Sequence, residues 1–258
     1  MSWHRIQSAL KYVLRAQGPY RLHSPFVFGL QQHVFDKKHC HYDFDWLAAL
    51  REELEQDDQV LHIEDHGAGS TSGAGNQRSV KSIAGRSVKR QKYAEFLYRL
   101  VDHMQPGAML ELGTSLGLTT LYLHRACPGA RCVSMEGAPA LVEFATGLHA
   151  AVGAGIEVVE GPFEQTLPAT VGKANWDFVF VDGNHRKEAT LKAVERLAPH
   201  LGEVAVVVID DIYWSRGMTE AWDELRKREQ FALSIDVFEM GILFVGLPMA
   251  KQHFVLRY

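Results

Sequence analysis

Strand-like and helix-like patterns alternate along the latter part of the chain. Continuous apolar runs at 178–181 and 204–209 are typical of strands buried on both faces of a parallel sheet. The segments between such runs carry apolar residues at helical spacing. We predict strands at 108–112, 131–135, 156–159, 176–181 and 204–209, and helices at 88–103, 119–126, 139–151, 163–169 and 186–201. This alternation indicates βαβ units with right-handed crossovers.

The end of the chain follows a different pattern. A helix predicted at 218–227 precedes two strands at 231–237 and 242–245, which are separated by Phe238-Glu-Met-Gly241. Parallel strands need a much longer crossover, so this short connection predicts an antiparallel hairpin. The expected fold class is α/β, with a doubly wound, mostly parallel sheet that ends in an antiparallel C-terminal hairpin.

Three helices are predicted before residue 60. The first has an apolar face, the second opens at Ser24-Pro25 with a capping serine and a first-turn proline, and the third covers 44–55. The apolar face of the first helix consists of Trp3, Ile6, Leu10, Val13 and Leu14. These faces need a partner, and we expect them to pack on the later domain. We predict an N-terminal helical extension with a loop over 1–85 and the main domain over 86–258.

The loop at 67–76 reads GAGSTSGAGN and has two interpretations. Its composition is that of a flexible linker, but loops without regular structure also serve as mobile lids over active sites. Basic residues follow it between Arg78 and Lys92. They are interpreted as a solvated helix face or as a rim that attracts an anionic substrate.

Composition and charge narrow the function classes. Hydrophobic residues make up 47% and charged residues 22% of the chain, which permits a packed core. The net charge of −4 argues against a general nucleic-acid binder, which carries an excess of basic charge. Three cysteines do not suggest a disulfide framework. No segment resembles a signal peptide or reaches the roughly 18 apolar residues of a membrane span, so we expect a cytoplasmic protein without a membrane partner.

A glycine-containing turn follows the first predicted strand. The segment Met109-Leu-Glu-Leu-Gly113 leads into Thr114-Ser-Leu-Gly117 and a helix. Ligands of open α/β sheets bind outside the carboxyl ends of the strands, where this turn lies. Its G-x-x-x-G spacing differs from the G-x-G-x-x-G of dinucleotide binders. The carboxylate of Glu111 would repel a pyrophosphate but suits a cationic or amino-bearing ligand.

The next two strand ends add to this pattern. Glu136 ends the second strand, where an acid can accept hydrogen bonds from both hydroxyls of a ribose. The third strand ends at Glu160-Gly161-Pro162-Phe163, which suits backbone and an aromatic edge beside an adenine. Together, these strand ends predict a nucleoside-containing ligand.

The segments Leu110-Glu-Leu-Gly-Thr-Ser-Leu-Gly117, Met135-Glu136 and Trp176-Asp-Phe-Val-Phe-Val-Asp182 resemble class I methyltransferases, in particular the catechol O-methyltransferase-like branch. The resemblance covers about 92–246. Bacterial methyltransferases of this kind also share the segments at 20–28 and 210–215. The resemblance implies a seven-stranded sheet, whose last hairpin inserts an antiparallel strand, and S-adenosyl-L-methionine as cofactor.

The same resemblance implies roles for individual residues. Glu111 and Gly113 would lie near the methionine end of the cofactor, and Asp182 near its amine. Ser115 and Gly117 would line the glycine loop. Glu136 would hold the ribose, and Gly161, Pro162 and Phe163 would flank the adenine.

Acidic residues at two later strand ends suggest where the chemistry occurs. Asp182, with His185 three residues on, and the pair Asp210-Asp211 follow consecutive parallel strands, so we expect them to converge. The matching positions of catechol-type enzymes hold magnesium with two aspartates and an asparagine, and have a lysine where His185 stands. The resemblance thus implies Asp182, Asp210 and Asp211 as ligands of Mg²⁺ or Mn²⁺. It implies His185 and Asp182 as catalytic residues. Alternatively, Asp182 faces the substrate or the cofactor amine, Asp210-Asp211 caps a turn, and His185 is a surface or loop histidine.

These features predict an S-adenosylmethionine-dependent methyltransferase that acts on an oxygen of a small molecule, with assistance by a divalent metal left open. The alternatives are a metal-independent N- or RNA methyltransferase, a nicotinamide-dependent oxidoreductase and a cofactor-binding protein without catalysis. Nucleic acid is not the expected partner, and a homo-oligomer stays open. We also expect Trp214 to line the substrate pocket.

Overall fold

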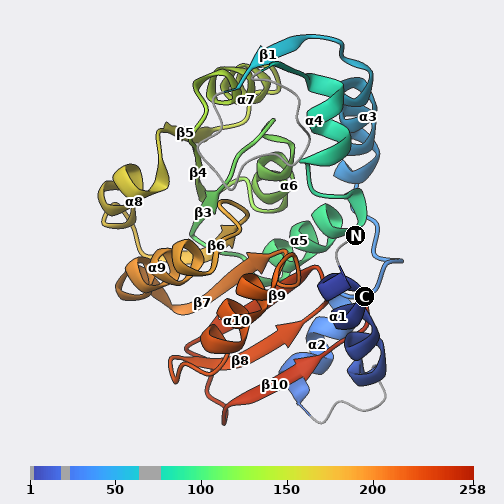
Figure 1. Cartoon of the computed structure of the whole chain (residues 1–258), viewed down its shortest axis with the longest axis vertical. Coiled ribbons are helices and arrows are strands. Elements are labelled where there is room, and N and C mark those ends of the chain that lie inside the picture. The colour runs from blue at the N-terminus through green and yellow to red at the C-terminus, as the bar shows by residue number, and fades with distance from the viewer. Residues whose placement is uncertain (1–2, 19–23, 64–76) are drawn as a thin grey trace. The chain divides into compact units, whose positions relative to one another are not determined.

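The computed structural model describes residues 3–18, 24–63 and 77–258. The chain forms two compact units, and Figure 1 colours it from the N-terminus to the C-terminus. Unit 1 comprises residues 1–29 with 167–258, and unit 2 comprises residues 30–166. The expected N-terminal extension is thus divided between the units, and a boundary near residue 85 stays a prediction. The Gly/Ser-rich loop at 67–76 lies outside the described residues.

Unit 2 contains three parallel strands of the main sheet. β3 (Ala108–Leu112) pairs with β4 (Arg131–Glu136), and β4 pairs with β5 (Ile156–Glu160). The intervening helices are α6 (Leu118–Ala126) and α7 (Pro139–Ala151). All five residues of β3 are buried, as its apolar pattern predicts. The βαβ units expected here are confirmed.

The first part of unit 2 is helical. Its helices are α3 (Asp43–Gln56), α4 (Val80–Arg86) and α5 (Gln91–Met104), with a short antiparallel ladder of β1 (Val60–His62) and β2 (Gln77–Ser79). The ladder and α4 are not among the predicted elements. Of the expected apolar face of α3, Leu47, Leu50 and Leu54 are buried, whereas Trp46 is exposed. Tyr98 of α5 donates a hydrogen bond to Asp43 of α3 over 2.8 Å.

Unit 1 contains five strands in the order β10-β8-β9-β7-β6. Their bounds are β6 (Trp176–Val181), β7 (Leu201–Asp210), β8 (Phe231–Asp236), β9 (Met240–Val245) and β10 (Gln252–Val255). β7 runs parallel to β6, whereas β9 runs antiparallel to both β7 and β8. The predicted C-terminal hairpin is confirmed. β10 pairs parallel with β8 and brings the strands of the main sheet to eight, one more than predicted.

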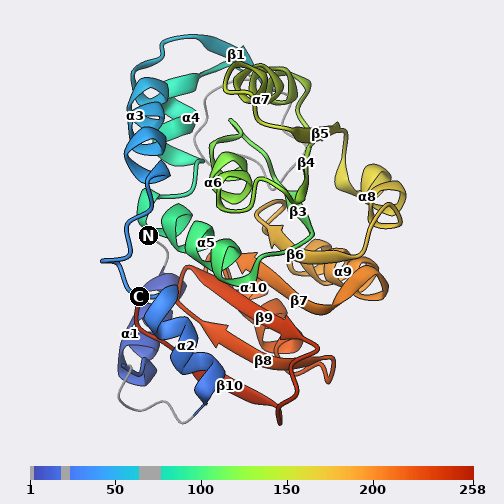
Figure 2. The ribbon, with the colours of Figure 1, turned by 180° about the vertical axis from the view of Figure 1, so that it is seen from behind.

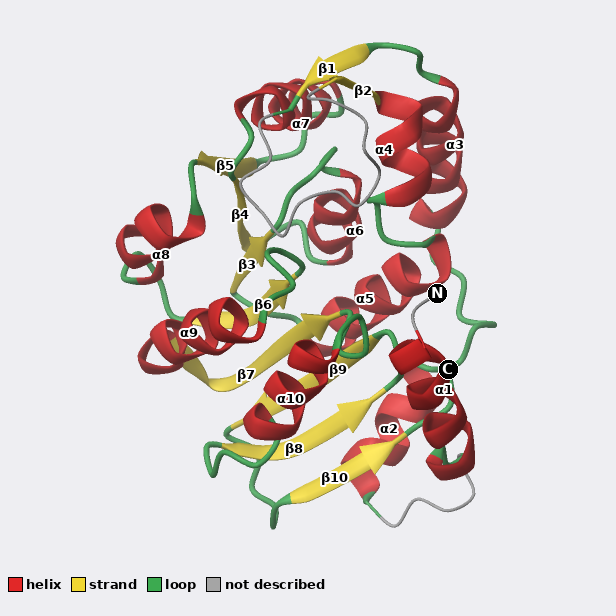
Figure 3. Ribbon diagram, in the orientation of Figure 1, coloured by secondary structure: helices red, strands yellow, loops and turns green. Residues whose placement is uncertain are grey.

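Helices cover both faces of the unit 1 strands, as Figures 1 and 2 show from opposite sides. Figure 3 colours these helices and strands by type. These helices are α9 (Lys187–Leu197), α10 (Arg216–Leu225) and the first part of α2 (Pro25–His33). A 3₁₀ turn (Ala198–His200) extends α9. The residues of α8 (Phe163–Val171) belong partly to unit 2 and partly to unit 1. Phe26 of α2 packs edge-on against Phe244 of β9. A Cβ atom on Gly241 of β9 would collide with the ring of Trp222 in α10. Gly241 and Phe244 are three residues apart in β9, so they point to opposite faces of the sheet.

The orientation of α1 (Trp3–Arg15) differs from the prediction. Its expected apolar face is exposed, with Leu10 at 63% and Leu14 at 87%. The other side of the helix, which is largely polar, faces unit 1: His4 lies 2.9 Å from the hydroxyl of Thr219. The prediction that this apolar face packs on the later domain was wrong. Periodicity in the sequence reveals that a helix is amphipathic, but it does not reveal which face turns inward. Within the described residues, no helix is long and apolar enough to cross a lipid bilayer.

Candidate active site

The turn between β3 and α6 is held by backbone contacts in unit 2. The amide of Gly113 donates to the carbonyl of Met135 in β4 over 2.9 Å. Gly117 caps α6 with a φ of +82°, and a Cβ atom there would lie 2.5 Å from Nε2 of His149. That nitrogen is 3.0 Å from the carbonyl oxygen of Gly117. Gly117 is therefore required both by its backbone conformation and by the close approach of α7.

Glu111 lies buried beneath this turn. Its Oε2 accepts hydrogen bonds from the hydroxyls of Thr120 and Ser134, over 2.5 and 2.6 Å. Its Oε1 has no hydrogen-bond partner among the described residues. Burial raises the pKa of Glu111 to about 7, although the two hydroxyls oppose this shift. A buried carboxylate with one uncompensated oxygen is suited to a cationic partner.

Glu136 connects the end of β4 to the glycine turn. Its Oε2 accepts the amide of Ser115 over 2.9 Å, and its Oε1 accepts the amide of Ala138 over 3.0 Å. The side chain is half-buried. The carboxylate is thus fixed at the strand end where the sequence predicted the ribose contact.

The end of β5 lies beside the same strand end. The amide of Gly161 donates to the carbonyl of Glu136 over 2.9 Å, and Gly161 has a φ of +129°. Pro162 and Phe163, where α8 begins, are half-buried. Unit 2 therefore brings together the predicted residues of three strand ends. Their contacts with a cofactor stay predictions.

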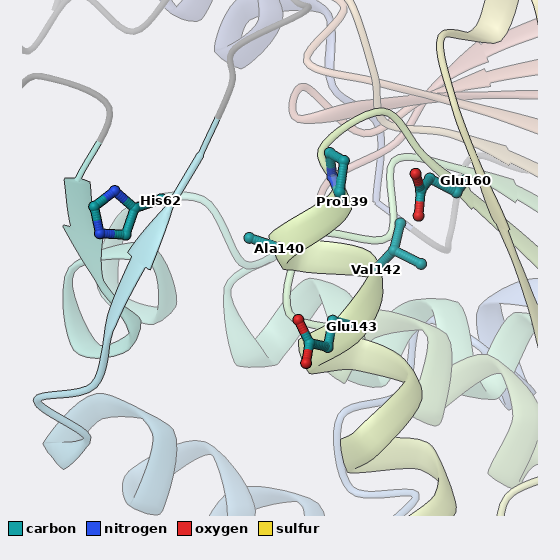
Figure 4. A pocket seen from close by; sticks show the side chains of 6 residues that line it. All are labelled: His62, Pro139, Ala140, Val142, Glu143 and Glu160. Carbon is teal, nitrogen blue, oxygen red and sulfur yellow. The ribbon is translucent and has the colours of Figure 1, made fainter.

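A hollow of about 440 Å³ lies beside the first turn of α7 (Figure 4). Its lining residues are His62, Pro139, Ala140, Val142, Glu143 and Glu160. It includes neither Glu136 nor the glycine turn. We therefore do not assign the predicted cofactor site to this hollow.

In unit 1, Asp182 and His185 lie together directly after β6. Nε2 of His185 is 3.8 Å from Oδ1 of Asp182, and both side chains are largely buried. The ring of His185 also contacts the ring of Trp214, with the centroids 6.2 Å apart. The structure thus pairs the two residues predicted to be catalytic and places an aromatic side chain beside them.

The acidic residues after β7 meet an arginine that the sequence analysis missed. Nη1 of Arg5 in α1 lies 3.5 Å from Oδ1 of Asp211, and its Nη2 lies 2.7 Å from Oε2 of Glu239. The guanidinium also lies 5.8 Å from the ring centroids of Trp214 and Phe238. Burial disfavours the charged form, but the carboxylates of Glu239, Asp211 and Asp210 outweigh it and raise the pKa of Arg5.

The expected convergence of Asp182, Asp210 and Asp211 on one metal ion is not found. Asp210 is buried at the end of β7, while Asp211 has a φ of +50° and its side chain faces Arg5. The described residues contain no group of three or more His, Cys, Asp or Glu side chains that fits a metal ion. The physical reason is that a guanidinium already compensates the charge of Asp211 and Glu239. This donor set does not fit the divalent cation that the resemblance implies.

Sequence reasoning found neither Arg5 nor Glu239. Arg5 stands on a helix predicted to contribute packing alone, and Glu239 stands in the hairpin connection. Arg5, Asp211 and Glu239 lie far apart in the sequence, so they do not form a local motif. The sole indication of this site in the sequence was an arginine on the polar side of an amphipathic helix.

Comparison with known proteins supports the sequence motifs. A family model described as a methyltransferase domain matches residues 110–212. No curated protein matches the sequence. The family match covers the glycine turn, Glu136 and both acidic strand ends.

Solved structures with the same fold include several methyltransferases. The O-methyltransferase TomG from Streptomyces achromogenes, involved in tomaymycin synthesis and solved with SAM, is 21% identical, with 61% of this chain and 81% of that chain covered and a TM-score of 0.53. The SAH-bound methyltransferase PaMTH1 from Podospora anserina is 14% identical, with coverages of 87% and 97% and a TM-score of 0.60. An O-methyltransferase from Bacillus cereus in complex with SAH is 16% identical, with coverages of 84% and 96% and a TM-score of 0.54.

At these identities the structural likeness shows the fold alone, which is the doubly wound α/β fold that these solved structures share. The matched residues, 110–212, are the part of the chain that carries the motifs from which the sequence predicted a methyltransferase.

Proposed function

We propose that the chain transfers a methyl group from S-adenosylmethionine to an oxygen nucleophile of a small molecule. The observation that carries this proposal is the fixed carboxylate of Glu136, which accepts the amides of Ser115 and Ala138 beside the glycine turn. The similar O-methyltransferase structures solved with SAM or SAH support the choice of donor.

Unit 2 carries the residues that we assign to the donor. Glu136 accepts the ribose hydroxyls, and the segment from Gly161 to Phe163 flanks the adenine. The buried Oε1 of Glu111 fits a cationic group such as the amino group of the methionine moiety. The donor supplies a methyl group that its sulfonium makes electrophilic. The protein must hold this group in line with the nucleophile, because orientation is the main requirement of a direct displacement.

Unit 1 carries the residues that we assign to the acceptor. The Asp182 carboxylate orients the imidazole of His185, whose Nε2 lies 3.8 Å away. We assign removal of the acceptor proton to Nδ1 of the same ring, since imidazole is the usual general base near neutral pH. Trp214, which contacts His185, is assigned to the wall of the acceptor pocket.

Arg5 takes the place of the divalent cation in this proposal. It lies against Asp211 and Glu239 and so compensates the charge of the acidic group after β7. We therefore propose that turnover does not depend on a divalent metal. The alternative is the metal-dependent mechanism that the family resemblance implies. The experiment must distinguish it from the metal-independent mechanism proposed above.

The test is transfer of a labelled methyl group from S-adenosylmethionine to a panel of phenols, catechols and hydroxy acids, with matched amines and an RNA pool in parallel. Each reaction is run with EDTA and with added Mg²⁺ or Mn²⁺. We expect label on hydroxyl acceptors and equal turnover in both conditions. Label on amines or RNA alone would contradict the acceptor class, and activity that EDTA abolishes and Mg²⁺ restores would contradict the role of Arg5.

A further inference from the structure

His149 is a buried histidine of unit 2 that the proposed mechanism does not use. It stands in the last turn of α7 and is 2% exposed. Its Nε2 lies 3.0 Å from the carbonyl oxygen of Gly117, and because a carbonyl oxygen can only accept a hydrogen bond, Nε2 carries the proton. The lone pair is then on Nδ1, which is buried and has no hydrogen-bond partner among the described residues. The contact with the glycine turn therefore fixes the tautomer of this ring.

The carbonyl of Gly117 lies at the junction between the glycine turn and α6. Besides the imidazole of His149, it accepts the amide of Leu121 over 3.1 Å, which begins the hydrogen-bond ladder of α6. The amide of Gly117 donates to the carbonyl of Thr114 across the turn over 2.9 Å. Glycine restricts its own backbone less than any other residue does. The imidazole thus adds a side-chain restraint at a position that needs one.

Helix α7 holds the glycine turn from both of its ends. At the start of α7, the amide of Ala138 donates to Glu136, and the same carboxylate accepts the amide of Ser115 in the turn. In the last turn of α7, His149 donates to Gly117. The carboxylate that we assign to the ribose and the imidazole of His149 therefore fix two points of one turn.

Packing alone does not account for a polar ring at this position. A leucine would fill a similar volume without burying a nitrogen that lacks a partner, and burying such a nitrogen is costly. Burial lowers the pKa of His149 below its usual value of about 6.5, the carbonyl of Gly117 opposes this shift, and the imidazole of His124 in α6 adds to it. The ring is therefore neutral near pH 7, and its hydrogen bond to Gly117 is the interaction that a leucine could not replace.

We propose that His149 is a positioning residue of the donor site, where its neutral Nε2–H form holds the glycine turn in the conformation that receives the cofactor. This inference rests on the proposed function, because the glycine turn is assigned there to S-adenosylmethionine. His149 acts through the carbonyl of Gly117 and does not itself touch the donor. It should therefore determine how tightly the donor binds.

Calorimetric titration with S-adenosylmethionine of wild type, His149→Gln and His149→Leu tests the proposal. The amide nitrogen of a glutamine reaches about as far as Nε2 of histidine and can donate to Gly117, whereas leucine has no donor. We expect His149→Gln to bind within about twofold of wild type and His149→Leu to bind about five- to tenfold more weakly, as the loss of one hydrogen bond predicts. Urea unfolding should rank the two variants in the opposite order, because leucine suits the core better than an amide with an unpartnered oxygen. A purely structural role would make affinity follow stability instead.

His124→Leu is the matched control. His124 is also a buried histidine whose Nδ1 has no partner among the described residues, but it stands in the last turn of α6, at the opposite end of that helix from Gly117. This variant should bind S-adenosylmethionine as wild type does. If His149→Leu does not fold, His149→Met takes its place, since the flexible side chain of methionine fits irregular spaces and also lacks a donor.

Two results would overturn the inference and leave the proposed function standing. One is a His149→Leu variant that binds the donor as tightly as wild type or as His149→Gln does. The other is an equal loss of affinity in His124→Leu, which would show that any buried histidine of these helices has the same effect. Wild-type protein that does not bind S-adenosylmethionine would overturn the proposed function itself, and with it the role of His149 in the donor site.

Discussion

The strand ends of unit 2 hold their carboxylates with neutral donors, whereas the end of β7 in unit 1 holds them with a cation. Glu136 accepts two backbone amides, and Glu111 accepts two hydroxyls. Asp211 and Glu239 instead face the guanidinium of Arg5. The buried Oε1 of Glu111 has no hydrogen-bond partner among the described residues, whereas Asp211 and Glu239 have a cation beside them within the protein.

This difference separates two roles that acidic residues can play in one protein. Uncompensated carboxylates are costly to bury, and a site keeps them where a ligand brings the opposite charge. Compensated carboxylates fix the position of the groups around them. The following changes test the comparison, from the largest expected effect to the smallest.

The largest effect is the pH dependence of stability that Glu111 causes. Burial raises the pKa of Glu111 from 4.5 to about 7, so the folded protein binds a proton more tightly than the unfolded chain. This contribution is fully present below about pH 4.5 and is lost as the pH rises through about 7, by about 3 kcal/mol in all. Urea unfolding of the ligand-free protein between these values measures it. Glu111→Gln should flatten this part of the profile, and identical profiles for both proteins would contradict the burial argument.

The next effect concerns the donor. Glu136→Ala should weaken binding of S-adenosylmethionine by about 1.5–3 kcal/mol, because charge-assisted hydrogen bonds to the ribose are lost. Glu160→Ala is the matched control, since Glu160 ends the neighbouring strand and lines the outer hollow. Calorimetric titration gives both affinities. Equal losses in the two variants would mean that charge near the strand ends, and not a specific contact, determines affinity.

The smallest effect tests the compensated group of unit 1. Arg5→Met should lower the free energy of unfolding by about 1–2 kcal/mol, because Glu239 and Asp211 lose their counter-charge in a partly buried setting. Arg5→Lys should recover part of this loss. Arg15→Met, at the exposed end of α1, is the control and should change little. A stability of Arg5→Met equal to that of wild type would show that the ion pairs contribute nothing.

The residues that we assign to the donor could be proposed from the sequence for a physical reason. They follow strand ends directly, and glycines such as Gly113 and Gly117 mark backbone conformations that other residues rarely adopt. These signals are local. Because Arg5 lies at the start of the chain and Asp211 after β7, no spacing in the sequence connects them.

Two features of the fold also escaped prediction. β10 is four residues long and begins with Gln252 and His253, so it lacks the apolar pattern of a buried strand. The amphipathic pattern of α1 was identified correctly, but its orientation depends on tertiary contacts such as that of His4 with Thr219. Periodicity carries no information about such partners.

Calorimetric titration of the wild-type protein with S-adenosylmethionine and, separately, with NAD tests the central claim most directly. The account predicts saturable binding of S-adenosylmethionine with one site per chain and no binding of NAD, because the carboxylate of Glu111 beneath the glycine turn would repel a pyrophosphate and attract a cation. Binding of NAD without S-adenosylmethionine would contradict the account and favour an oxidoreductase.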